Sequence, residues 1–211
     1  MKSQNKRPTR KVADRRRFPP EERKEQILKA ARDVFVRLGL NGARTKDIAN
    51  EMGVTEPTLF IYFKTKQELF QAAIVEPLKA LLSLPRMKGI DFASASTESE
   101  KNEVCLAAVR EIVVAMEDVY PLLITAQFSS QELGAEIYNK EIYPVLQEIG
   151  EAVSTGFSLT DKNLAEFVAL STFGLSFSAV MHHHYKGTTL DVDLVSENIS
   201  NLLLSGIERE I

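Results

Sequence analysis

The sequence predicts an all-α protein with two parts, a small N-terminal domain and a larger C-terminal one. Apolar residues recur at helical spacing through most of the 211 residues. The 10 glycines and 8 prolines are few, and several of them mark the ends of the periodic segments. These observations favour a globular protein built from packed helices.

Charge divides the chain at about the same place. Residues 1–17 hold eight lysines and arginines against one aspartate, whereas residues 67–211 hold nine against twenty-one acids. The net charge of −3 by itself argues weakly against nucleic acid as a partner. A basic front joined to an acidic rear instead favours nucleic acid as a partner of the N-terminal part alone.

The number of cysteines and the composition of the N-terminus indicate the cellular compartment in which the protein is expected. The single cysteine, Cys105, excludes an internal disulfide framework and is consistent with a reducing environment. The basic N-terminus lacks the apolar run of a secretory signal. We therefore expect a cytoplasmic protein.

Residues 1–17 are polar, basic and without periodicity, so we expect a disordered arm in the free protein. One role for this arm is to lie along DNA, where it would steepen the salt dependence of binding. The other role is that of a solubilising tail without specific contacts. The DNA-binding domain proper is expected at 18–66.

The first helix is expected to begin at Pro19-Pro20, with Glu21, Glu22 and Glu25 in its positive first turn. Gly39 should end it. Its expected inward stripe consists of Ile27, Ala30, Ala31, Val34, Phe35 and Leu38.

Two short helices joined by a tight turn are expected between Thr45 and Lys66. Thr45 should cap the first of them with its hydroxyl, and Gly53 should make the turn in a left-handed conformation. The inward residues of this helix are Ile48, Ala49 and Met52.

The second short helix should be capped by Thr55, with Glu56 and Pro57 in its first turn. Its inward residues are Leu59, Phe60 and Phe63, and its opposite face carries Thr55, Thr58 and Tyr62, with Glu56 and Ile61 nearby. A small Ala49, a turn at Gly53 and a Leu59 that fills the angle are the layout of a helix-turn-helix.

The residues from Glu22 to Gln71 resemble the N-terminal domain of the TetR family of bacterial transcriptional regulators. The resemblance rests on Asp47-Ile48-Ala49, Met52-Gly53-Val54-Thr55, Thr58-Leu59-Phe60 and the run from Tyr62 to Leu69. Two departures concern which DNA is read: Phe60 stands where the family usually has tyrosine, and Pro57 where glycine or alanine is commonest. Beyond Gln71 only the overall helical plan is similar.

The motif and the resemblance together indicate which residues contact double-stranded DNA. The candidates are Arg44, Thr45, Lys46, Thr55, Glu56, Pro57, Thr58, Ile61, Tyr62, Lys64 and Lys66. Threonine can meet a thymine methyl or a phosphate, and Glu56 could accept from cytosine N4 or simply stabilise the first turn. Lys64 and Lys66 flank the start of the next helix and are expected to hold phosphates.

The fourth helix should open with a capping box of Thr65 and Glu68 and run to about residue 82 as a bridge between the two parts, with a kink at Pro77. Residues 83–100 are expected to be a mobile loop.

Five helices are expected after Lys101. The first should end before Pro121, which should start a short second one, and Ser129 with Glu132 should open a third that is kinked at Pro144. The last two span Leu164–Met181 and Leu194–Ile207.

The segment Leu164–Met181 is apolar on nearly every face. A membrane span is the alternative interpretation, but Glu166, its hydroxyl residues and the lack of basic flanks argue against it. A helix between its own core and a second subunit fits better. By the resemblance, the last two helices form a homodimer interface. The residues expected at this interface are Leu175, Ser178, Ala179, Ile199, Leu202 and Leu203.

The resemblance also implies a small-molecule effector site in residues 67–211. Candidate lining residues are Met116, Tyr120, Phe128, Tyr138, Tyr143, Phe173, Phe177 and His182, each of which could equally be ordinary core. No catalytic set, cofactor motif or metal spacing is present; consecutive His182, His183 and His184 cannot converge on one ion from a single helix. Cys105 is expected to be inert core rather than a redox sensor.

The sequence therefore favours a non-enzymatic, dimeric, ligand-released repressor that binds a palindromic operator. The alternative is a DNA-binding architectural protein, or one controlled by a protein partner without a small ligand.

Overall fold

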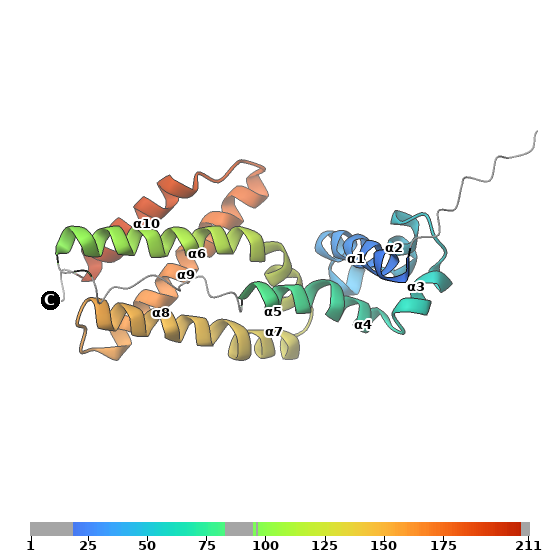
Figure 1. The fold of residues 1–211 in the computed structure, drawn as a ribbon, viewed down its shortest axis with the longest axis horizontal. Helices are drawn as coiled ribbons and strands as arrows, with labels where there is room; N and C mark the ends of the chain where they lie inside the picture. The colour runs from blue at the N-terminus through green and yellow to red at the C-terminus, as the bar shows by residue number, and fades with distance from the viewer. Residues whose placement is uncertain (1–18, 83–94, 96, 208–211) are drawn as a thin grey trace, which may run out of the picture.

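The computed structural model describes residues 19–82, 95 and 97–207, and the elements among these residues are helices with no strand. The predicted basic arm at 1–17 and most of the predicted loop lie outside the described residues. Figure 1 shows an elongated molecule with a small helical head at one end and a larger helical body at the other.

The head consists of α1 (Pro20–Gly42), α2 (Thr45–Glu51) and α3 (Glu56–Tyr62). Helix α1 is interrupted at Gly39, whose φ of 69° confirms the expected break. Five of the six residues in its predicted inward stripe are buried. Leu38 is the exception: it is 43% exposed, so the prediction that it faces inward was wrong.

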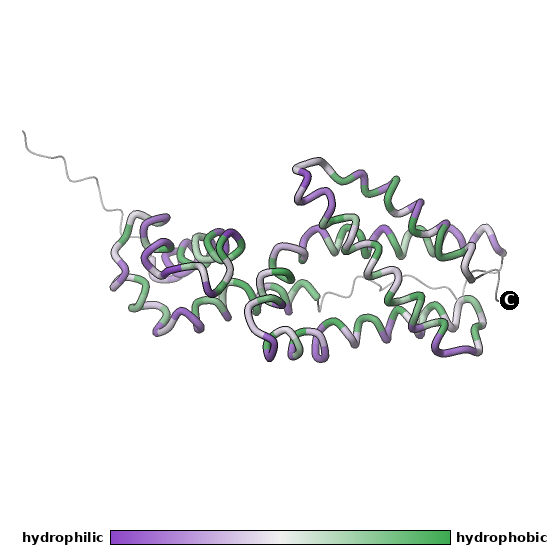
Figure 2. The backbone as a smooth tube through the Cα atoms, turned by 180° about the vertical axis from the view of Figure 1, so that it is seen from behind, coloured by the Kyte–Doolittle hydropathy of each residue, from purple (hydrophilic) through white to green (hydrophobic). Residues whose placement is uncertain are grey.

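The body is formed by α6 (Glu98–Gln127), α7 (Gln131–Ile137), α8 (Tyr143–Gly156), α9 (Lys162–Lys186) and α10 (Val192–Ile207). Helix α9 packs against both α6 and α8, and α10 packs against α6 and α9. In Figure 2, apolar and polar residues alternate along the long helices, as expected of helices with one buried face. An ion pair between Arg110 Nε and Asp193 Oδ1, 2.8 Å apart, joins α6 to α10.

The bridge from head to body is continuous but not uniform. It consists of α4 (Lys66–Phe70), a π-helical turn η1 (Gln71–Val75) and α5 (Glu76–Leu82). The wide turn ends two residues before Pro77, where the sequence predicts a kink. Proline has no N–H to offer Ala73, four residues earlier, and Arg32 Nε of α1 donates to that carbonyl instead, over 3.2 Å.

A second π-helical turn, η3 (Tyr138–Ile142), joins α7 to α8 and likewise ends two residues before a proline, Pro144. It provides the expected irregularity of that segment. Lys79 of α5 lies 3.7 Å from Glu141 of η3, so an ion pair links the bridge to this second turn.

Three predictions about the body were wrong. Helix α6 runs unbroken through Pro121 to Gln127, because its long packed face outweighs the local cost of one proline. It also starts at Glu98, inside the predicted loop, where Thr97 and Glu100 form a capping box. The cap of α7 is Ser130 rather than Ser129; the Ser130 hydroxyl accepts from Leu133 N over 3.2 Å.

By length and composition alone, α9 could cross a membrane. One of its faces is buried against the other body helices; this face consists of Ala165, Val168, Ala169, Thr172, Ser176 and Val180. The buried apolar residues of head and body form one continuous cluster.

The contact of Arg32 with the bridge generates a testable prediction. Arg32→Met keeps the apolar stem but removes the donor to Ala73 O, so the free energy of unfolding should fall by about 1 kcal/mol. Urea denaturation measures this change.

Arg37→Met on the same helix is the matched control. It breaks only a solvent-exposed ion pair with Glu51, at 3.6 Å, and should cost about 0.5 kcal/mol or less. Equal losses in the two variants would show that Arg32 has no special role at the bridge.

Candidate nucleic-acid interface and body cavities

The angle between α2 and α3 is set by buried apolar contacts and one glycine. Ile48, Ala49, Leu59 and Phe63 are each no more than 4% exposed. Gly53 adopts the expected positive φ, 64°, and Val54 N then donates to Ala49 O over 3.0 Å. This arrangement holds α3 on the outside of the head, as the sequence predicts for a helix-turn-helix.

The start of α2 differs from the prediction. Its N-cap is Arg44 rather than Thr45, and the Asp47 carboxylate accepts from Arg44 N over 3.1 Å. Thr45 is the first helical residue, and its hydroxyl donates to the Glu56 carboxylate at the start of α3. Side chains therefore connect the N-termini of both helices.

Helix α3 begins at Glu56, with Thr55 at the predicted N-cap position. The Thr55 hydroxyl does not cap the backbone; its oxygen lies 3.0 Å from the Thr58 hydroxyl oxygen. Thr58 and Tyr62 are half-buried, and the Tyr62 ring packs against the head core.

The prediction that Phe60 faces inward was wrong, because 43% of its surface is exposed. Successive residues in a helix are separated by about 100°, so Phe60 lies about a quarter turn from Leu59, which faces the core. Ile61 lies almost opposite Leu59 and is 78% exposed. Pro57 is exposed on the same outward side.

Basic side chains lie on both sides of α3 in the sequence, at the start of α2 and between α3 and α4. Arg44 and Lys46 are exposed at the start of α2, and Lys64 is exposed just after α3. Lys66 is half-buried, and its Nζ donates to Ala43 O over 2.9 Å, which uses one of its three N–H groups. Lys66 thus connects α4 to the segment just before α2. It also lies where the sequence predicts a phosphate contact.

The predicted cap of α4 is confirmed in its main feature. The Thr65 hydroxyl accepts from Glu68 N over 3.0 Å. The Glu68 carboxylate accepts from Lys64 N over 2.7 Å rather than from Thr65 N. The Lys64 backbone is thereby fixed while its ammonium remains exposed.

The family model for bacterial regulatory proteins of the tetR family matches residues 27–73, which run from α1 into η1. The head of this protein is therefore an N-terminal domain of the TetR family. The match covers the head and the start of the bridge, so it accounts for the segment that holds the candidate DNA-contacting residues.

Two relatives show how identity and coverage vary: one match is short and more identical, and the other is long and less identical. The chain is 39% identical over 67 residues to FasR, an HTH-type transcriptional activator of Mycolicibacterium smegmatis. That match covers 32% of this chain and 31% of FasR, so the chain spans about a third of that relative's length. This chain is 24% identical over 185 residues to the class D tetracycline repressor of Escherichia coli. That match covers 88% of this chain and 78% of the repressor.

Solved structures share the whole fold. The Bacillus subtilis regulator FadR, determined in complex with stearoyl-CoA, superposes with a TM-score of 0.61 at 21% identity. The superposition covers 87% of this chain and 98% of that chain. At this identity the likeness concerns the fold alone: an N-terminal helix-turn-helix head followed by a helical body.

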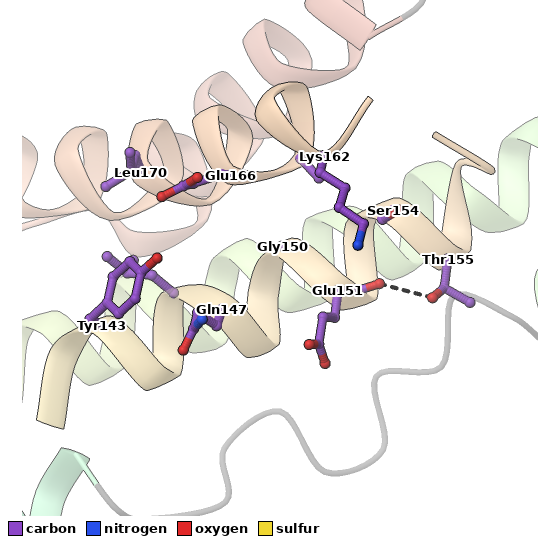
Figure 3. Close-up of a pocket in the computed structure, with 11 residues that line it drawn as sticks. Tyr143, Gln147, Gly150, Glu151, Ser154, Thr155, Lys162, Glu166 and Leu170 are labelled. Carbon is purple, nitrogen blue, oxygen red and sulfur yellow. Dashed lines mark hydrogen bonds between the residues drawn. The ribbon is translucent and has the colours of Figure 1, made fainter. Parts of the chain in front are cut away.

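A groove of about 450 Å³ runs between α8 and α9. In Figure 3, Tyr143, Gln147 and Glu151 lie along α8, and Lys162, Glu166 and Leu170 of α9 face them across the groove. The two helices meet closely at Gly150, where a Cβ atom would lie 3.5 Å from Ala165 O. The small residues Gly150 and Ala165 bring the two helices together at their crossing, and polar side chains on either side of the crossing line the groove.

Of the predicted effector-lining residues, Tyr143 lines this groove. Met116 and Tyr120 are buried in the core instead, where the Tyr120 ring lies 5.4 Å from Phe177, and Phe173 stacks on Phe177 at 6.3 Å. Phe128 is 77% exposed and Tyr138 and His182 are also exposed. The structure thus separates the predicted set into a core cluster, one groove residue and the surface.

Sequence reasoning missed the remaining groove residues. A signal for them exists: Tyr143, Gln147, Glu151 and Ser154 recur at helical spacing as a polar stripe on α8. The stripe resembles an ordinary solvated face until α9 is placed opposite it.

The interior of the body holds two groups with altered proton affinity. Burial raises the pKa of the Cys105 thiol, while the neighbouring Ser200 hydroxyl acts in the opposite direction. The Tyr120 hydroxyl is buried without a hydrogen-bond partner of good geometry among the described residues. Burial is the main cause that raises the pKa of Tyr120 to about 12, and the neighbouring Tyr185 adds to it.

This raised pKa predicts an alkaline loss of stability. The folded protein holds the Tyr120 proton above pH 10, where the unfolded chain releases it, so the free energy of unfolding should fall as pH rises from about 10 to about 12. Tyr120→Phe should flatten this decline, and because the hydroxyl makes no hydrogen bond of good geometry among the described residues, the free energy of unfolding at pH 7 should change by less than about 1 kcal/mol. Chemical denaturation at a series of pH values measures both effects.

Tyr138→Phe, at an exposed position on the same domain, should keep the alkaline decline. If Tyr120→Phe loses more than about 1 kcal/mol at pH 7, its hydroxyl has a partner in solution and the interpretation is wrong.

Proposed function

We propose that this protein is a dimeric transcriptional regulator of the TetR family that binds a palindromic operator and represses transcription until a small molecule releases it. The observation that carries the proposal is the exposed α3, held away from its own core and flanked by Arg44, Lys46 and Lys64. Residues 18–66 would form the DNA-reading domain and residues 67–211 the effector and dimerisation domain of a cytoplasmic, non-enzymatic protein.

Exposed apolar residues on α9 and α10 support dimerisation. On α9, Phe167, Leu170, Leu175, Met181 and Tyr185 are between 37% and 73% exposed. Leu194 and Leu202 continue the apolar surface on α10, at 54% and 64%. We call these seven residues the seam. A surface this apolar on a globular protein favours a partner, and a second copy supplies two reading heads for adjacent major grooves about 34–36 Å apart.

The predicted interface residues fall into two groups. Leu175, Ser178 and Leu202 are exposed and Ala179 is half-buried, so they are available to a partner. Ile199 is buried in the core of its own chain and Leu203 is half-buried against it. We propose that these two support α10 from behind.

The α8–α9 groove is our proposed effector site. Its volume of about 450 Å³ lies within the range of small-molecule sites. Leu170 belongs both to the groove and to the seam, so a ligand that spreads the groove would change how the two subunits pack. The free energy of DNA binding would then weaken by at most the difference between the ligand's binding free energies for the two subunit packings, the one that binds DNA and the one that does not.

Selection of bound duplexes from a random-sequence library, followed by fluorescence anisotropy at several salt concentrations, tests the function. We expect a palindromic site bound with steep salt dependence. Recovery of no preferred sequence would refute the proposal. A reporter gene placed behind the selected site then separates repression from activation, which matters because FasR is named as an activator.

Phosphate contact at Lys64 predicts a change in salt dependence. Lys64→Met should weaken binding to every duplex similarly and reduce the slope of log K against log[salt] by about 0.9 for each phosphate that is no longer neutralised, or about 1.8 for a dimer. The matched control is Lys140→Met, which removes an exposed lysine of the body that pairs with Glu136. If both variants keep the parental slope, Lys64 does not bind phosphate.

The seam predicts that the dimer can be separated without unfolding the chain. Leu175→Glu combined with Leu202→Glu places two charges per subunit on the seam, and analytical ultracentrifugation should show monomers with weakened operator binding. Phe128→Glu, at an apolar side chain outside the seam that is more exposed than either leucine, should remain dimeric. A double variant that stays dimeric would place the interface elsewhere.

A further inference from the structure

The outward surface of α3 is apolar at its centre. Ile61 lies about 200° around the helix from the buried Leu59, and Pro57 lies about 160° from it, so these two residues occupy the middle of the outer face. Ile61 is the most exposed of the large apolar side chains among the described residues, at 78%. Phe60, 43% exposed, extends the apolar surface to one side.

The polar side chains of α3 are largely engaged with one another or with the head. The Glu56 carboxylate accepts from the Thr45 hydroxyl, and the Thr58 and Thr55 hydroxyl oxygens lie 3.0 Å apart. The half-buried Tyr62 packs against the head core. These contacts use part of the hydrogen-bonding capacity that the helix could offer to base edges.

The composition of α3 points in the same direction. Its seven residues, EPTLFIY, include no arginine, lysine, asparagine or glutamine. Arginine and lysine make the bidentate contacts that identify guanine, and asparagine and glutamine make those that identify adenine. This helix lacks the side chains for both kinds of contact.

One base edge in the major groove carries an apolar group, namely the C5-methyl of thymine. We propose that α3 recognises its half-site through thymine methyl groups, which contact the side chains of Ile61 and Pro57, with Phe60 at the edge of the same surface. This inference rests on the proposed function, because it assumes that α3 enters the major groove. It adds a chemical class of operator: one with thymines at the positions that face the centre of α3.

Deoxyuridine tests the proposal, because it pairs as thymine does but lacks the methyl group. Each thymine of the selected site is replaced in turn, symmetrically in both half-sites, and the dissociation constant is measured by anisotropy. Burial of one methyl corresponds to about a fourfold change in affinity, so replacement in both half-sites should weaken binding by about sixteenfold at the contacted position. At the other thymines the change should stay within about twofold.

The side-chain partner is identified with Ile61→Ala. This variant should bind the thymine site more weakly than the parent protein, and the effect of deoxyuridine substitution should shrink to about twofold because the methyl group then faces no large apolar side chain. Ile61 is exposed, so thermal unfolding of the variant should match the parent. Val36→Ala removes an exposed apolar side chain of α1 and should retain the full deoxyuridine effect.

The outcomes separate this inference from the proposed function. Sequence-specific binding with no deoxyuridine effect at any position overturns thymine-methyl recognition and leaves the regulator proposal standing. A deoxyuridine effect that persists unchanged in Ile61→Ala overturns the assignment to Ile61. Absence of any sequence-specific binding overturns both proposals.

Discussion

The packing of α3 against α2 is the constraint on which the rest of the head depends. Leu59 is buried beside Ala49, and Gly53 at φ 64° turns the chain so that the second helix can cross the first. A larger residue than alanine at the contact would push α3 away from α2, and a Cβ atom at Gly53 would strain the left-handed turn. Because Ile61 and Pro57 lie opposite Leu59, that same contact determines which side chains face outward. Burial of one leucine thus fixes the chemistry of the outer surface.

Proline determines how the head is connected to the body. Pro77 leaves the Ala73 carbonyl without its helical donor, and Arg32 of α1 takes that position, so the irregular turn becomes an attachment point between head and bridge. Pro144 follows a second wide turn, and the Lys79–Glu141 ion pair joins the two irregular segments. Movement of α8 can therefore reach the bridge through direct contacts. Pro121, by contrast, lies in a helix whose long packed face holds it regular.

Much of the head could be predicted from its sequence because its signals are local. Gly39 and Gly53 adopt positive φ values that only glycine adopts readily, and the spacing of Ile48, Ala49 and Leu59 defines the buried faces. The errors occurred where two elements compete for one side chain. Thr45 was expected to cap α2, but the Glu56 carboxylate of α3 binds its hydroxyl. Phe60 was expected inward, but Leu59 and Phe63 already fill the space beneath α3.

The sequence by itself determined the all-helical class, the helix-turn-helix with its turn at Gly53, and the separation of a basic front from an acidic rear. Each of these follows from residues that are neighbours in the chain or one helical turn apart. Only the tertiary structure decided where the α8–α9 groove opens, that Ile199 faces its own core, and that Lys66 bonds to Ala43. Those features depend on how helices far apart in sequence cross, and helical periodicity identifies a buried face without identifying what lies against it.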